Sequence, residues 1–325
     1  MNFQEFKTFR EEVIEQISPL RLDCMNPFKA MDFLKGAPLD TASHSVNTTL
    51  DTWASTMNVH HYRDRAIASQ GVRESLKALF PIFANDNKEL WLPEDVYPFY
   101  WDTAHKTGIS THSFPTLPDI DLTPLNRSSK NSVVVITNPL SPSGRFLKKQ
   151  EIEQIKNWLE GSTDRQIIID TVYSYSSSFD AHTIELFETG QCFIAHSLSK
   201  AWIERGVFGV LLPPEINHNL CKSIIQQPSE KSCSLALSAL TKRPDLPTRQ
   251  QERFSREWKR LTPFIQKFAP QFTPPSTGYF TVVEAHHEKI LEESQALAIP
   301  ASVFGSTNPQ LSVVSCLYNI NNKSN

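Results

Sequence analysis

The residues best suited to covalent chemistry are a lysine, an aspartate and a tyrosine that follow apolar runs. Lys200 ends the run Ser-Leu-Ser-Lys at 197–200, and Asp170 and Tyr173 follow an earlier apolar run in the same way. A lysine amine can form a Schiff base with a carbonyl group and can afterwards move a proton. A positioned carboxyl or phenol group can hold or transfer protons beside it. We therefore treat these three side chains as a candidate reaction centre.

A second segment has the features of an anion site. Residues 69–74 read Ser-Gln-Gly-Val-Arg-Glu and precede an apolar helical run at 76–80. The free amides at the start of a helix favour a phosphate or carboxylate group. Each feature also has an ordinary structural explanation: Asp170 could be a helix cap, Lys200 a solvated lysine, and Gly71 a turn residue. Their order along the chain favours the functional interpretation.

These residues must be positioned by strands and helices that alternate from about residue 65 onwards. Short β-branched runs separated by helical ones are typical of βαβ units around a largely parallel sheet. The predicted strands are 133–137, 166–169, 192–195 and 207–212. The candidate residues follow the carboxyl ends of these strands, where open α/β sheets bind their ligands. We predict an α/β fold in which helices flank a mostly parallel mixed sheet.

The two chain ends have a different pattern. An amphipathic helix that Pro19 ends opens the chain, and long polar helices with a few strand-like runs close it. We predict three parts: an N-terminal helix and arm over 1–45, a large domain over 46–245 that carries the candidate site, and a small domain over 246–325. The arm and the C-terminal part together form the smaller α/β domain.

Composition narrows the choice of partners. The 325 residues include 32 basic and 35 acidic ones, for a net charge of −3. This balance gives no electrostatic basis for binding nucleic acid or an anionic membrane. No apolar run approaches the roughly 18–20 residues of a membrane helix, and the first residues lack the pattern of a signal peptide. We expect a cytoplasmic protein that acts on a small molecule.

Several common motifs are absent from the sequence. No G-x-G-x-x-G, G-x-x-x-x-G-K-[ST] or G-x-S-x-G pattern occurs, which argues against a dinucleotide fold, a P-loop and a nucleophile elbow. His287-Glu288 begins like a zinc-protease motif, but Leu291 occupies the position of the second histidine. The five cysteines form no C-x-x-C pair, so we expect reduced thiols and no metal site.

In chain order, these segments resemble the pyridoxal-phosphate-dependent aminotransferases of fold type I, class I/II. Residues 138–144 resemble the N-P-x-N-P-x-G pattern of that family, residues 170–173 its D-x-x-Y pattern, and residues 197–200 its S-x-S-K pattern. Weaker similarities occur at 95–98, 275–280 and 300–305. The resemblance extends over about residues 65–316. It implies the family's fold and its cofactor, pyridoxal 5'-phosphate.

The resemblance also implies a role for individual residues. Lys200 would form the Schiff base and move the α proton, Asp170 would keep the pyridine nitrogen protonated, and Tyr173 would bond the ring hydroxyl. Tyr97 would stack on the ring. The other cofactor-binding residues that it implies are Gln70, Gly71, Val72, Asn138, Ser141, Ser197, Ser199 and Arg205.

Three positions depart from the family pattern. Ser141 replaces its second asparagine, and Phe208 stands where an arginine is expected to clamp the cofactor phosphate. Gln310 occupies the substrate-binding position of an arginine that holds the substrate carboxylate. Each hydrogen bond to such a charged group is typically worth about 1.5–3 kcal/mol. Arg205 is the nearest cation that could replace the phosphate arginine.

We predict an aminotransferase-like transferase that acts on an amino acid or a related amine. A lyase, decarboxylase or cyclase acting on a modified amino acid is an alternative, because Gln310 replaces the carboxylate arginine. A non-catalytic descendant that binds the cofactor or a protein is a second alternative, although intact Lys200, Asp170 and Tyr173 favour an enzyme. The resemblance implies a homodimer and leaves the amino donor, the acceptor and the biosynthetic pathway open.

Overall fold

A seven-stranded sheet forms the centre of the computed structural model, which describes residues 1–27, 44–203 and 207–317. The strand order is β2-β8-β7-β6-β5-β3-β4. The strands are β2 (Ile67–Ser69), β3 (Glu89–Pro93), β4 (Ser110–Phe114), β5 (Ser132–Thr137), β6 (Gln166–Asp170), β7 (Cys192–Ser197) and β8 (Gly209–Leu212). Neighbouring strands pair in parallel, except that β8 is antiparallel to both β2 and β7. This is the mostly parallel mixed sheet that the sequence predicts.

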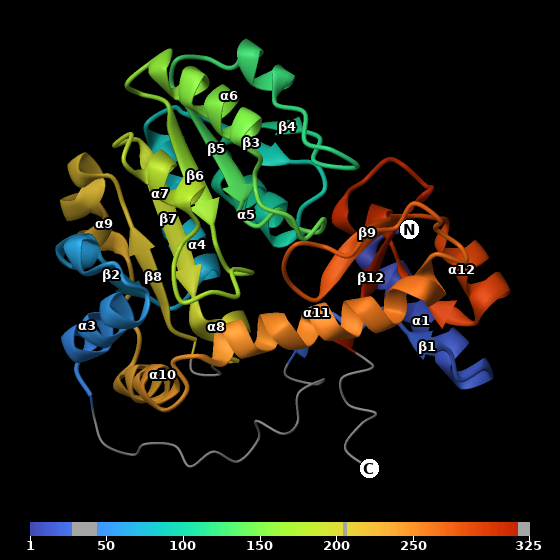
Figure 1. Ribbon diagram of the computed structural model, residues 1–325. Coiled ribbons are helices and arrows are strands. Elements are labelled where there is room, and N and C mark those ends of the chain that lie inside the picture. The colour runs from blue at the N-terminus through green and yellow to red at the C-terminus, as the bar shows by residue number, and fades with distance from the viewer. Residues whose placement is uncertain (28–43, 204–206, 318–325) are drawn as a thin grey trace.

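Helices cover both faces of this sheet (Figure 1). The helices that belong to this part are α3 (Val46–Thr56), α4 (Val72–Asn85), α5 (Phe99–Thr107), α6 (Lys149–Glu160), α7 (Ala181–Phe187), α8 (Leu198–Ala201), α9 (His218–Ile224) and α10 (Glu230–Lys242). Val133 and Val135 pack with α4 and α5 on one face, while Val134 and Ile136 pack with α6 and α7 on the other. Burial on both faces explains why β5 is apolar at consecutive positions rather than alternating ones.

The chain ends meet in two small sheets. β9 (Phe280–Glu284), β11 (Ile299–Pro300) and β12 (Leu311–Ser315) form an antiparallel sheet, and β1 (Leu20–Arg21) pairs with β10 (Ala296–Leu297). The helices here are α1 (Phe3–Gln16), α11 (Leu246–Ile265) and α12 (His287–Ser294). In Figure 1, α11 runs from the neighbourhood of α8 to these small sheets. Short 3₁₀ segments complete the fold at His60–Arg65, Thr123–Arg127, Glu215–Asn217 and Ala301–Phe304.

Most element bounds differ from the predicted ones by a few residues. The strand predicted to begin at 207 begins at Gly209, because Val207 adopts a left-handed backbone with φ of 59°. The domain divisions after residues 45 and 245 stay predictions. Among the described residues, no helix is long and apolar enough to span a bilayer, and no cluster of side chains could hold a metal ion.

Candidate active site

Three adjacent parallel strands end at the same edge of the sheet. Thr137 at the end of β5 lies opposite Asp170 at the end of β6, and Asp170 lies opposite Ala195 in β7. The chain enters α8 directly after β7, which places Lys200 just beyond this edge. The Nζ atom of Lys200 lies 6.0 Å from the centroid of the Tyr173 ring. Sheet topology thus brings the candidate lysine, aspartate and tyrosine together.

Asp170 is a buried carboxyl group with a defined set of donors. Asp170 is 2% exposed. One carboxylate oxygen accepts a hydrogen bond from the backbone amide of Val172 at 2.8 Å, and the other accepts a short one from the Tyr100 hydroxyl. Burial raises the pKa of Asp170 to about 6, while both hydrogen bonds act to lower it. The carboxyl group is therefore mainly ionised at neutral pH, close to its titration range.

Tyr100 is a site residue that the sequence reading missed. It lies in α5, one helical turn after Tyr97, and it is buried. Burial and the neighbouring Asp170 raise the pKa of the Tyr100 phenol well above its usual value, so it remains a hydrogen-bond donor. In the sequence, only the spacing of three residues from Tyr97 pointed to Tyr100. That spacing indicates a site residue only when α5 is known to lie beside the end of β6.

Lys200 has an amine that loses its proton more readily than an exposed lysine. Burial lowers the pKa of Lys200, and the positive charge of Arg73 acts in the same direction. A larger fraction of the amine is then neutral, which is the form that attacks a carbonyl carbon. Arg73 is the second residue of α4.

Tyr173 faces aromatic neighbours from the small sheet. Its ring meets Phe280 edge to face at a centroid distance of 4.8 Å and Tyr279 at 6.2 Å. Burial, followed by the charges of Asp170 and Tyr97, raises the pKa of Tyr173, so the phenol stays protonated. Tyr97 itself is 49% exposed just before α5. Its role in stacking on the cofactor ring stays a prediction.

The predicted phosphate segment forms a glycine-lined cradle at the start of α4. Gly71 is the N-cap of α4 with φ of 90°, a left-handed value that glycine adopts without strain. A Cβ atom on Gly71 would lie 3.7 Å from the Ser197 Oγ atom. A Cβ atom on Gly209 would come within 2.6 Å of the Gly71 Cα atom. Two glycines therefore let the first turn of α4 approach the end of β7.

The serines of this segment bond to each other. The Oγ atom of Ser197 donates to the Oγ atom of Ser199 at 3.0 Å and accepts the Ser199 amide at 3.2 Å. Gln70 donates its side-chain amide to the Gln227 carbonyl at 3.2 Å. The cradle is thus built from α4, β7 and β8, which are distant in sequence.

The Asn138 side chain forms its hydrogen bonds within the protein. Its amide group donates to Asp180 at 3.0 Å and to Thr183 at 2.9 Å, and its Oδ1 atom accepts the Leu147 amide at 3.0 Å. Both amide hydrogens are used, so these contacts fix the loop after β5 to α7. Ser141 donates its backbone amide to the Thr137 hydroxyl at 2.8 Å. Cofactor binding by these two side chains stays a prediction.

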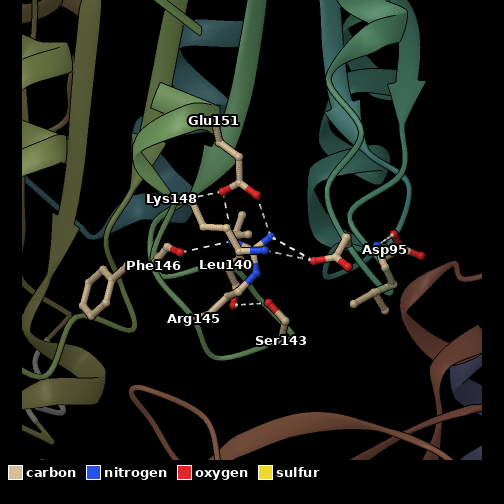
Figure 2. A network of polar contacts seen from close by, with 9 residues as sticks. Asp95, Leu140, Ser143, Arg145, Phe146, Lys148 and Glu151 are labelled. Atoms are coloured by element: carbon tan, nitrogen blue, oxygen red, sulfur yellow. Dashed lines mark hydrogen bonds and ion pairs between the residues drawn. The ribbon is translucent and has the colours of Figure 1, made fainter. Parts of the chain in front are cut away.

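The same loop is tied to its surroundings by the network in Figure 2. The guanidinium of Arg145 bonds both carboxylate oxygens of Glu151 at 2.8 and 2.9 Å. The carbonyl of Ser143 accepts a hydrogen bond from Thr281 in β9 at 2.8 Å. A Cβ atom on Gly144 would lie 2.8 Å from the Phe280 carbonyl, so only glycine fits here. The loop therefore joins the large sheet to β9 beside Tyr173.

The positions that depart from the family pattern have different surroundings. Phe208 is fully buried in the apolar core, and its carbonyl accepts the Leu198 amide at 3.1 Å. Gln310 is exposed before β12, whereas Ser315 at the other end of that strand pairs with Phe280. At about 3.4 Å per residue, Gln310 is about 17 Å of strand away from that end. Its substrate role stays a prediction, and Arg205 lies outside the described residues.

Pyridoxal phosphate suits the donor set that the structure brings together. A buried carboxyl group can hold a protonated ring nitrogen, and a lysine with a lowered pKa can react with an aldehyde. A protonated phenol beside them can donate to a ring oxygen. The glycine-lined start of α4 offers space and backbone amides to a phosphate.

Comparison with known proteins assigns the class. The family described as aminotransferase class I and II matches residues 39–315, and the chain therefore belongs to this family. The predicted family, fold type I architecture and pyridoxal phosphate cofactor are thereby confirmed.

Individual relatives are similar over different extents. A histidinol-phosphate aminotransferase of Lactococcus lactis is 31% identical over 115 residues, which are 35% of this chain and 32% of that protein. The match thus spans about a third of the length of this curated relative. An aspartate aminotransferase double mutant of Thermus thermophilus has a TM-score of 0.76 at 13% identity, over 98% of this chain and 93% of the other. A PLP-bound C-S lyase of Staphylococcus hominis has a TM-score of 0.69 at 13% identity, over 90% and 84%. These structures show the shared fold.

Proposed function

We propose that this protein is a pyridoxal-phosphate-dependent aminotransferase that acts on an amino acid or a related amine. The observation that carries the proposal is that the ends of neighbouring strands bring to one edge of the sheet the buried Asp170 carboxyl group and the Lys200 amine, which has a lowered pKa and lies 6.0 Å from the Tyr173 ring centroid. When bound, pyridoxal phosphate supplies an aldehyde and an electron-withdrawing ring that acidifies the α carbon of the substrate.

The residues of the chain divide the remaining work. The Nζ atom of Lys200 would hold the aldehyde carbon of the cofactor, and the Lys200 amine would accept and return the α proton of the substrate. The Asp170 carboxylate, which accepts the Tyr100 hydrogen bond at one oxygen, would keep the pyridine nitrogen of the cofactor protonated. The Tyr173 hydroxyl would donate a hydrogen bond to the ring hydroxyl oxygen of the cofactor. The rings of Tyr279 and Phe280 beside Tyr173 exclude water from this side.

The test is a spectral titration of purified protein with pyridoxal phosphate, followed by product analysis. We expect a visible absorption band that is lost in Lys200→Ala and retained in Lys148→Ala, which removes an exposed lysine elsewhere. Folding of each variant is checked by circular dichroism. A wild-type protein without the band, or a band unchanged in Lys200→Ala, would contradict the proposal.

Product analysis separates the alternatives. Keto acid formed in equal amount with a newly aminated acceptor identifies transamination, whereas keto acid with free ammonia identifies a lyase. The lyase alternative is favoured by Gln310, which is exposed where the family has an arginine. Cofactor binding without any product would favour the non-catalytic descendant. Histidinol phosphate is the first amine to assay, because the curated relatives carry that activity in their names.

We also propose that the protein is a cytoplasmic homodimer. The support is membership in the aminotransferase class I and II family, for which the resemblance implies sites near a subunit interface. Light scattering coupled to gel filtration measures the mass in solution. A mass of one chain, 36.9 kDa, at micromolar concentration with cofactor bound would contradict the dimer.

A further inference from the structure

The position directly before β8, where the family has an arginine for the cofactor phosphate, carries no cation in this chain. Phe208 occupies that position, and its ring lies in the apolar core with none of its surface exposed. The backbone carbonyl of Phe208 is engaged by the Leu198 amide. A phosphate beside Gly71 and Ser197 would therefore receive no charge from this position.

A different cation stands at the same cradle. Arg73 is the second residue of α4, directly after Gly71 and Val72, and its side chain is exposed. Its guanidinium carbon lies 5.9 Å from the centroid of the Phe99 ring, at the start of α5. The guanidinium is close enough to the Lys200 amine to lower its pKa. The positive charge of Arg73 therefore acts on the Lys200 amine.

This arrangement concentrates positive charge in the protein without its cofactor. A cation in the first turn of a helix is opposed by the positive end of the helix dipole, and here a lysine adds a second positive charge. Glu74, the acid in that turn, is paired with Lys77 at 2.7 Å. A phosphate dianion bound here would be attracted by the helix dipole, by Arg73 and by Lys200.

We propose that Arg73 binds the cofactor phosphate and takes over the role of the arginine that Phe208 replaces. The inference rests on the proposed function, because it assigns a residue to the cofactor site. It places the cation in the first turn of α4 rather than directly before β8, next to the free backbone amides at the start of that helix. The planar guanidinium suits two parallel hydrogen bonds to phosphate oxygens.

Lys77 provides a matched control. It lies on the same helix one turn later, and its Nζ atom is also 5.9 Å from the Phe99 centroid. Lys77→Met removes the same charge next to the same ring, while Arg73→Met removes the proposed contact. Arg205→Met tests the competing cation that the sequence resemblance implies, and a larger loss of pyridoxal phosphate binding in Arg205→Met than in Arg73→Met would overturn the inference.

The experiment measures dissociation constants of the cofactor-free protein for pyridoxal phosphate and for pyridoxal, which lacks the phosphate. We expect Arg73→Met to weaken pyridoxal phosphate binding about ten- to a hundredfold and pyridoxal binding about twofold or less. Arg73→Lys restores part of the loss. Lys77→Met leaves both constants within about threefold of the wild type.

A second measurement follows the charge of Lys200. Removing the neighbouring positive charge raises the pKa of the amine, so the pH midpoint for its reaction with pyridoxal moves upward in Arg73→Met. A purely structural role of Arg73 would not move this midpoint. The inference is overturned if Arg73→Met binds pyridoxal phosphate like the wild type, or if it loses pyridoxal equally. A wild-type protein that binds neither compound refutes the proposed function itself.

Discussion

Replacing Tyr100 by phenylalanine tests whether the Tyr100 hydroxyl keeps Asp170 ionised. Burial raises the pKa of Asp170 to about 6, and the Tyr100 hydrogen bond is the stronger of the two contacts that oppose this rise. A hydrogen bond to a charged group contributes about 1.5–3 kcal/mol. At 1.36 kcal/mol per tenfold change in the ionisation equilibrium, its loss shifts the titration of Asp170 upward by about one to two pH units. Asp170 would then be largely protonated at neutral pH.

The assay starts from protein prepared without cofactor and measures its affinity for pyridoxal phosphate as a function of pH. A protonated Asp170 cannot accept the hydrogen bond of a protonated ring nitrogen, so the affinity reports the ionisation of Asp170. Wild-type affinity should fall as the pH drops through about 6, the pKa of Asp170. In Tyr100→Phe, the same fall should occur about one to two pH units higher. Tyr175→Phe is the matched control, since its buried hydroxyl has no hydrogen-bond partner among the described residues. Equal midpoints in all three proteins would refute the reasoning.

Three further predictions concern stability and packing. Asp170→Asn should stabilise the cofactor-free protein by about 3 kcal/mol at pH 7 and abolish activity, because a carboxyl group with a raised pKa costs stability as the pH rises from 3.8 to about 6. Urea unfolding should show this gain at pH 7 and almost none at pH 4. Burial lowers the pKa of His196 to about 3, so stability falls as the pH drops below 6.5, by about 2 kcal/mol at pH 5. His196→Phe in the Asp170→Asn background, where the opposing titration is absent, should lose this slope, and an unchanged slope would refute the assignment. Gly209→Ala should destabilise the protein by about 1–3 kcal/mol and weaken phosphate-dependent cofactor binding, because the added Cβ would meet the Gly71 backbone at 2.6 Å. Unfolding and cofactor titrations that match the wild type would show that the close approach is unimportant.

The central strands were predictable because their sequence is both apolar and β-branched. Buried runs such as Val133 to Ile136 have few alternatives to a strand that is covered on both faces. The edge of the sheet was harder to predict. Val207 is apolar and β-branched, yet its left-handed backbone delays the strand to Gly209. A left-handed backbone at a single residue leaves no mark in hydrophobic periodicity.

The candidate site also contains residues that the sequence could predict and residues that it could not. Lys200, Asp170 and Tyr173 could be found because each stands at or just after the end of a strand, so that local sequence alone indicates the edge where it lies. Tyr100 and Arg73 could not be found in this way. Each lies on a helix, and a helical pattern shows which residues share a face without showing what that face meets.

The sequence by itself determined the α/β class, the order of the reactive residues and the resemblance to pyridoxal-phosphate enzymes, because these depend on local pattern and chain order. Only the tertiary structure decided the ionisation of Asp170 and Lys200, since pKa values depend on burial and on charges from other elements. It also decided that Phe208 belongs to the core and that Gly71 lies against β7. Contacts between residues far apart in the chain appear only when the strands have paired and the helices have packed on them.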